Sequence, residues 1–142
     1  MRRYGAGGMT AATMIRPRRR VFPGATSQVG RARLFVGDVL DGCPVADDAV
    51  LLTSELVTNA IAHTASGRGG KVIVTVYRAG TRVRIDVKDD GSDHAPVAHP
   101  VGEARESGFG LGLVDLMADR WGHCGGRRGR VVWFMLEWKA NG

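Results

Sequence analysis

Apolar and polar residues alternate in two neighbouring stretches of the chain, residues 72–77 and 83–88, which are joined by the short turn at 78–81. Such alternation places apolar side chains on one face of a strand and polar side chains on the other. The two stretches are therefore predicted to form a β-hairpin with one buried face.

Apolar residues at helical spacing predict three helices. The first runs from a cap at Thr26 or Ser27 to about Leu40, the second from about Val45 to His63, and the third from near Gly110 to residues 120–122. Strands are predicted at 20–22 and 131–138, a basic turn at 125–129, and a lid or binding loop over the unpatterned residues 89–107. With an optional strand before the last one, this order predicts an α+β fold with helices on one face of a mixed, mostly antiparallel sheet.

Length and composition leave room for one domain, because the chain has 142 residues of ordinary globular composition. No apolar run is long enough for a membrane helix, so no membrane contact is expected. The two cysteines, Cys43 and Cys124, form no CxxC pair, which disfavours a disulfide framework and fits a cytoplasmic location.

The net charge of +6 comes from the first twenty residues, which hold six arginines and no acid. The remaining fourteen acidic and fourteen basic residues balance, so no direct contact with nucleic acid is expected. Residues 1–17 are predicted to be a disordered basic leader, with a weak contact to an acidic partner as the alternative, and residues 18–142 to be the folded domain.

The second predicted helix carries Glu55, Asn59 and His63, each four residues after the last, so they share one stripe. The stripe is either a plain solvent face or the wall of a cavity. A neutral amide oxygen suits Mg²⁺, which relies on phosphates and water for most of its ligands. A carboxylate one turn away can deprotonate an attacking hydroxyl.

Asp89, Asp90 and Gly91 follow the second strand of the hairpin. They are either a simple turn or a site at which a carboxylate accepts a hydrogen bond from an exocyclic amine such as that of adenine. Gly91 would let a ring approach the backbone closely.

Alternate glycines at Gly108, Gly110 and Gly112 immediately precede the third predicted helix. They are either a hinge or a place where phosphate reaches the N–H groups at a helix start. Their position after the long loop disfavours a dinucleotide fold, and the chain has no P-loop motif.

Taken in this order, Glu55-x-x-x-Asn59, Asp89-x-Gly91 and Gly108-x-Gly110-x-Gly112 resemble the N, G1 and G2 boxes of the GHKL ATPase superfamily. Further resemblance to the anti-sigma-factor serine/threonine kinases of the RsbW and SpoIIAB type, in their short standalone actinobacterial form, lies in ELVTNAIAH at 55–63, LVDLMADRWG at 113–122 and VWFML at 132–136. The resemblance spans residues 20–138 and implies a Bergerat-type sandwich.

The resemblance implies a role for each matching residue. Asn59 would hold Mg²⁺ and Glu55 would be the general base. Asp89 would bind the adenine amine beside Gly91, and residues 92–107 would form the lid over ATP, with Arg105 reaching the γ-phosphate. The phosphates would be cradled by Gly108, Gly110, Leu111, Gly112 and Leu113.

The function implied is an ATP- and Mg²⁺-dependent kinase that binds a sigma factor and phosphorylates a STAS-domain anti-anti-sigma protein. Residues 21–40 would be the surface for a partner or for the second copy of a homodimer. The alternative is a non-catalytic ATP-binding regulator whose nucleotide state sets partner affinity. Least favoured is a DNA-binding protein using the arginine-rich leader.

The sequence departs from this family at three places. Asp93 replaces a frequent second glycine, Val131 replaces a threonine whose hydroxyl lies near the nucleotide, and the lid contains His94 and His99. A metal site made of Asp93, His94 and His99 is disfavoured because no fourth ligand is evident. Side chains assigned no chemistry are the packing residues Trp121, Trp133 and Trp138, the solvated turn residues Arg127, Arg128 and Arg130, and the inert cysteines.

Overall fold

The structure, a computed structural model, describes residues 14–93 and 111–140. Its elements are, in chain order, β1 (Met14–Pro23), the 3-10 turn η1 (Thr26–Gln28), α1 (Val29–Val39), α2 (Ala46–His63), η2 (Ala65–Gly67), β2 (Lys71–Ala79), β3 (Arg82–Asp89), α3 (Gly112–Met117), β4 (Arg120–Gly126) and β5 (Gly129–Glu137).

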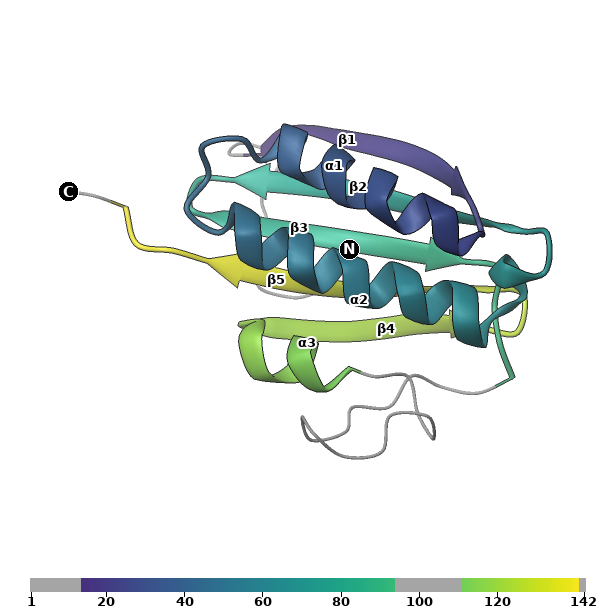
Figure 1. Cartoon of the computed structure of the whole chain (residues 1–142). Helices are drawn as coiled ribbons and strands as arrows, with labels where there is room; N and C mark the ends of the chain where they lie inside the picture. Colours follow the sequence, from purple (N-terminus) through teal and green to yellow (C-terminus); the bar gives the residue numbers. More distant parts are fainter. Residues whose placement is uncertain (1–13, 94–110, 141–142) are drawn as a thin grey trace.

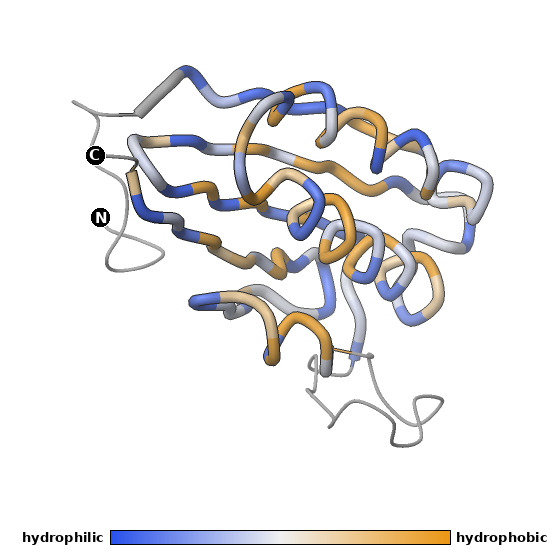
Figure 2. Tube along the Cα trace, turned by 60° about the vertical axis from the view of Figure 1, so that its left-hand side comes forward, coloured by the Kyte–Doolittle hydropathy of each residue, from blue (hydrophilic) through white to orange (hydrophobic). Residues whose placement is uncertain are grey.

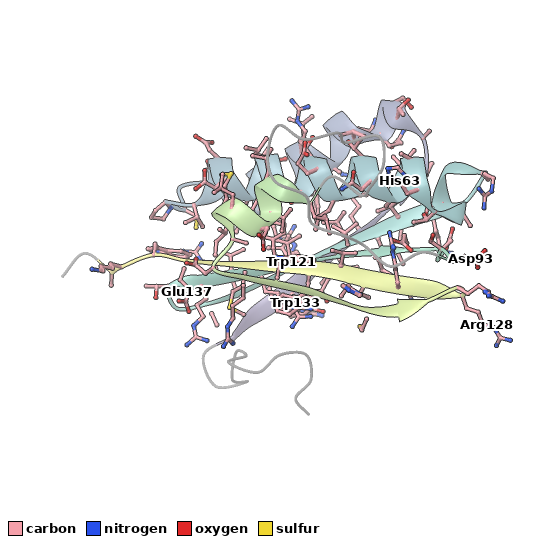
Figure 3. All side chains as sticks on the ribbon, turned by 90° about the horizontal axis from the view of Figure 1, so that it is seen from below. His63, Asp93, Trp121, Arg128, Trp133 and Glu137 are labelled. Atoms are coloured by element: carbon pink, nitrogen blue, oxygen red, sulfur yellow. The ribbon has the colours of Figure 1, made fainter. Side chains whose placement is uncertain are left out.

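The five strands form one sheet in the order β1-β2-β3-β5-β4, and every neighbouring pair is antiparallel. The helices lie on one face of this sheet (Figures 1 and 3). The predicted α+β sandwich is therefore confirmed. Its sheet is expected from the sequence to be mixed, but among the described residues every strand pairing is antiparallel.

The core lies between the helices and the covered face of the sheet. Leu52, Leu56 and Ala60 are spaced so that they share one face of α2, and all three are buried. Alternate residues of β2 and β3, among them Val74 and Ile85, meet them from the sheet. Figure 2 shows the apolar positions concentrated in these helices and in the middle of the strands. Each such buried leucine, isoleucine or valine contributes about 1.5–3 kcal/mol of transfer free energy.

The predicted third helix is too long. Helix α3 ends at Met117, and Arg120–Gly126 is β4, paired along its length with β5. The optional strand of the predicted order is thus present, and the basic turn is the tight connection at residues 127–128. Pairing with β5 outweighs the weak strand preference of the three glycines in β4.

Strand β1 begins at Met14, inside the range 1–17 that the sequence suggests is a leader, and pairs with β2 up to Pro23. Gly108, Gly110, Arg105 and most of the predicted lid lie outside the described residues. Among the described residues, no helix combines the length and apolar character needed to cross a membrane.

Candidate functional site

Helix α2 supplies the stripe of Glu55, Asn59 and His63. Glu55 and Asn59 are half-buried, whereas His63, in the last turn of the helix, is exposed. The amide nitrogen Nδ2 of Asn59 is buried without a hydrogen-bond partner, and it is the sole such side-chain nitrogen or oxygen in the part of the chain described. A buried amide donor without a partner is costly, so this position calls for an acceptor.

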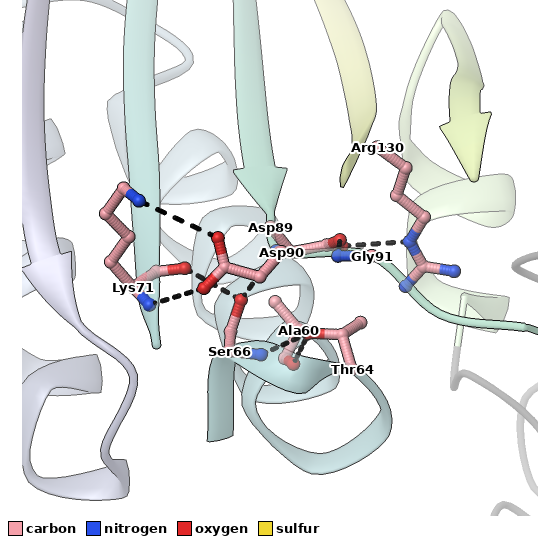
Figure 4. A network of polar contacts seen from close by, with 8 residues as sticks. All are labelled: Ala60, Thr64, Ser66, Lys71, Asp89, Asp90, Gly91 and Arg130. Atoms are coloured by element: carbon pink, nitrogen blue, oxygen red, sulfur yellow. Dashed lines mark hydrogen bonds and ion pairs between the residues drawn. The ribbon is translucent and has the colours of Figure 1, made fainter. Parts of the chain in front are cut away.

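The end of α2 is fastened to the strands by a polar network (Figure 4). Ser66 receives its orientation from Thr64, whose Oγ1 accepts the Ser66 N–H at 3.1 Å. The Ser66 hydroxyl donates to the Lys71 carbonyl at 2.7 Å and accepts the Asp90 N–H at 2.9 Å. Asp90 Oδ2 accepts the Lys71 N–H at 2.9 Å. These bonds fix the end of α2 relative to the start of β2 and the end of β3.

Asp89, the last residue of β3, forms a buried ion pair with Arg130. Arg130 Nε donates to Asp89 Oδ2 at 2.8 Å, and the two side chains are 3% and 1% exposed. Asp89 Oδ1 accepts the Gly91 N–H at 2.7 Å, so the predicted turn chemistry is also present. Burial raises the pKa of the Asp89 carboxyl, and the hydrogen bond and charge of Arg130 oppose that rise.

Arg130 is not the solvated turn residue that the sequence suggests. In the β3–β5 register it lies opposite Asp89, whereas Val131 lies opposite Lys88. Because side chains alternate along a strand, Arg130 and Val131 point to opposite faces, and position 130 is the one beside Asp89. The sequence did contain a signal for this burial. Arg130 lies two residues before the buried Val132 and therefore shares its face of the strand.

Gly91 has φ of +97°, and a Cβ there would lie 2.3 Å from the Arg127 carbonyl oxygen. The Ala65 N–H donates to the Gly91 carbonyl at 3.0 Å, and the Ser92 N–H donates to the Gly126 carbonyl at 3.2 Å. The end of β3 is thus held between the loop after α2 and the β4–β5 hairpin. The close approach that requires glycine is to this hairpin, and contact of Gly91 with a ring stays a prediction.

His63, the last residue of the helix stripe, is affected by the charge of the ion pair. Its pKa is lowered first by desolvation and then by the positive charge of Arg130. The last turn of the α2 stripe is therefore within electrostatic range of the pair at the end of β3.

The start of α3 holds the described residues of the third motif, residues 111–113. Leu111 is buried in the core, Gly112 is the first residue of the helix, and Leu113 packs against the core. Helix α2 contacts both α3 and β3. Helix α2, which carries the first motif, therefore contacts the two elements that carry described parts of the other motifs, while Gly108, Gly110 and Arg105 lie outside the described residues.

The donor set fits Mg²⁺ better than a metal that needs several side chains. Across residues 14–93 and 111–140, no three His, Cys, Asp or Glu side chains gather as a metal site. Mg²⁺ is held by few protein oxygens together with substrate phosphates and water. The Asn59 amide can offer such an oxygen if it turns over, or donate its Nδ2–H to a phosphate oxygen as it stands.

The remaining residues singled out in the sequence are structural. Trp121 and Trp138 pack against the core as predicted, and Trp133 is half-buried on the face without helices (Figure 3). Cys43 and Cys124 are free, the first buried and the second exposed.

Residues 22–136 match the family model described as "Histidine kinase-like ATPase domain". A search of curated proteins gave no match. The matched range contains every motif described above and ends one residue before the end of β5.

Proposed function

Because the chain belongs to the histidine kinase-like ATPase family, we propose that it is an ATP- and Mg²⁺-dependent protein serine/threonine kinase of the anti-sigma-factor type. It binds a sigma factor in one state and phosphorylates a STAS-domain anti-anti-sigma protein in the other. The proposal includes action in the cytoplasm, where these partners work.

The observation that carries the proposal is the buried, unpartnered amide of Asn59, one helical turn from Glu55. A ligand rich in acceptor oxygens supplies what this amide lacks, and a triphosphate with Mg²⁺ is such a ligand. Bound there, the metal would neutralise charge that develops on the transferred phosphoryl group.

Glu55 is suited to the base role by its position. It shares the stripe with Asn59, is half-buried, and has access to solvent through which a substrate serine can approach. In the proposed reaction its carboxylate takes the proton of the serine hydroxyl, the serine oxygen bonds to the γ-phosphorus, and ADP leaves.

The adenine end of the site would lie at Asp89 and Gly91, and the phosphates near Gly108, Gly110, Leu111, Gly112, Leu113 and Arg105. Asp89 is buried at a strand end with one oxygen on Gly91 and the other on Arg130. Each carboxylate oxygen can accept more than one hydrogen bond, so an exocyclic amine can still be received.

The kinase is tested by incubating the protein with γ-labelled ATP, Mg²⁺ and a STAS-domain partner. Glu55→Gln is expected to abolish label transfer while ATP binding persists. Glu137→Gln is the matched control, because Glu137 is exposed in an ion pair with Arg82 at the opposite end of β3 from Asp89.

One outcome contradicts the role given to Glu55, and another contradicts the kinase itself. Transfer that survives in Glu55→Gln removes the base assignment. ATP binding without transfer by the wild type indicates the alternative, a regulator whose nucleotide state sets partner affinity.

A further inference from the structure

The buried ion pair between Arg130 and Asp89 is more than the proposed ATP site requires. Arg130 is one of the few charged side chains buried in the described chain. Its Nε donates a hydrogen bond to Asp89, the carboxylate proposed to bind the adenine ring. The pair lies at the strand end that is held by Ala65 and Gly126. The positive charge of Arg130 therefore acts directly on the carboxylate that would recognise the purine.

The charge state of Asp89 decides which bases it can recognise. An ionised carboxylate only accepts hydrogen bonds, whereas a protonated carboxyl also donates one. A purine with a 6-amino group offers a donor, and a purine with a 6-keto group offers an acceptor at the same place. For a contact at the 6-position, a carboxylate therefore pairs with the 6-amino group and is repelled by the 6-keto oxygen, whereas a protonated carboxyl can pair with either.

We propose that Arg130 is a positioning and specificity-determining residue that keeps Asp89 an ionised acceptor and so makes the site select a 6-aminopurine nucleotide. This inference rests on the proposed nucleotide-binding function. It assigns to Arg130 a role that the sequence motifs do not contain.

The surroundings of Asp89 make this role necessary. Burial raises the pKa of the Asp89 carboxyl and the neighbouring Asp90 charge adds to the rise, whereas Arg130 and the Gly91 N–H lower it. His63, the titratable group of α2 near the pair, feels the charge of Arg130 and is itself disfavoured as a cation. Removing Arg130 leaves the Gly91 N–H as the chief opposition to protonation of Asp89.

The test compares binding of ATP and inosine triphosphate, which differ at the 6-position of the purine, by calorimetry with Mg²⁺ between about pH 6 and about pH 8. The wild type and Arg130→Lys, which keeps the charge, are expected to prefer ATP at every pH. Arg130→Met is expected to lose about tenfold of that preference, with the loss growing as the pH falls. Arg127→Met is the matched control, since Arg127 is an exposed residue of the same hairpin whose partner is Asp93.

Circular dichroism establishes that each variant is folded. An unchanged preference and pH profile in Arg130→Met overturns the inference. If Arg130→Met does not fold, the Arg130→Lys variant decides the inference. Loss of the preference for ATP in that variant would show that a positive charge at position 130 is not sufficient, and would overturn the inference. Absence of binding of both nucleotides to the wild type instead refutes the proposed function itself.

Discussion

Replacing Gly91 with alanine tests how the end of β3 is held against the β4–β5 hairpin. Gly91 has φ of +97°, a conformation that costs an L-residue about 1–2 kcal/mol. Its Cβ would also lie 2.3 Å from the Arg127 carbonyl oxygen and 2.6 Å from that of Gly126. Both obstacles are backbone atoms, so no side-chain rotation relieves them.

The cost follows from these distances. Ordinary contact begins at 3.4 Å, so the Arg127 carbonyl must withdraw by 3.4 minus 2.3, or about 1 Å. The hairpin is held by the Ser92–Gly126 hydrogen bond, which that shift would weaken or break at a cost of about 1 kcal/mol. With the backbone strain and the residual overlap, Gly91→Ala is expected to lower the free energy of unfolding by about 3–4 kcal/mol.

The assay is equilibrium unfolding in urea with two control variants. Gly69→Ala has φ of +84° and nothing within 4 Å of its Cβ, so it reports the conformational cost alone, about 1 kcal/mol. Gly126→Ala has open space and no positive φ, so its effect is expected to be within about 0.5 kcal/mol. A Gly91→Ala variant no less stable than Gly69→Ala would refute the claim that the hairpin backbone abuts Gly91.

Three further predictions concern the charged and polar groups of the site. Asp89→Asn leaves Arg130 buried without its carboxylate and is expected to lower the free energy of unfolding in urea by about 3 kcal/mol. Glu137→Gln, in an exposed ion pair, is expected to lower it by about 1 kcal/mol or less. Equal losses would contradict the buried state of the Asp89–Arg130 pair. His63 has a lowered pKa in the folded state, so the unfolded chain binds its proton more readily and the stability it contributes is lost as the pH falls below about 6.5. His63→Gln should flatten the stability profile in that window, and an unaltered slope would count against it. Asn59→Asp should change the Mg²⁺ concentration needed for ATP binding, and an identical magnesium titration would remove the ligand assignment.

The sequence predicts the central part of the fold well, because alternation and helical spacing survive where one face of an element is buried. The hairpin β2–β3 and helix α2 have such faces, and both lie within a residue or two of their predicted bounds. Strand β1 is an edge strand with exposed arginines at 16 and 18–20, so its pattern gives little sign of where it starts.

The parts that the sequence misses are set by contacts between distant residues. Strand β4 contains Gly122, against which the Trp133 ring lies so closely that a Cβ would be 2.9 Å from it. That packing explains why a glycine occurs within the strand, but local sequence propensity does not predict the packing. Arg130 has the same origin, since its partner Asp89 is 41 residues away and its sequence neighbours suggest only a basic turn.

The candidate residues themselves came from spacing and family resemblance, which indicate residue types but not their partners. The structure adds that the Asn59 amide lacks a partner, that Asp89 is already in an ion pair, and that Gly91 is required by the neighbouring hairpin. Each of these facts changes which substitution is informative.

The most direct test of the account is a crystal structure of the protein with a non-hydrolysable ATP analogue and Mg²⁺. We expect one bound nucleotide whose adenine amine donates to Asp89 and whose phosphates and metal meet the Asn59 amide. A nucleotide bound elsewhere, or one that contacts only one of these two residues, would contradict it.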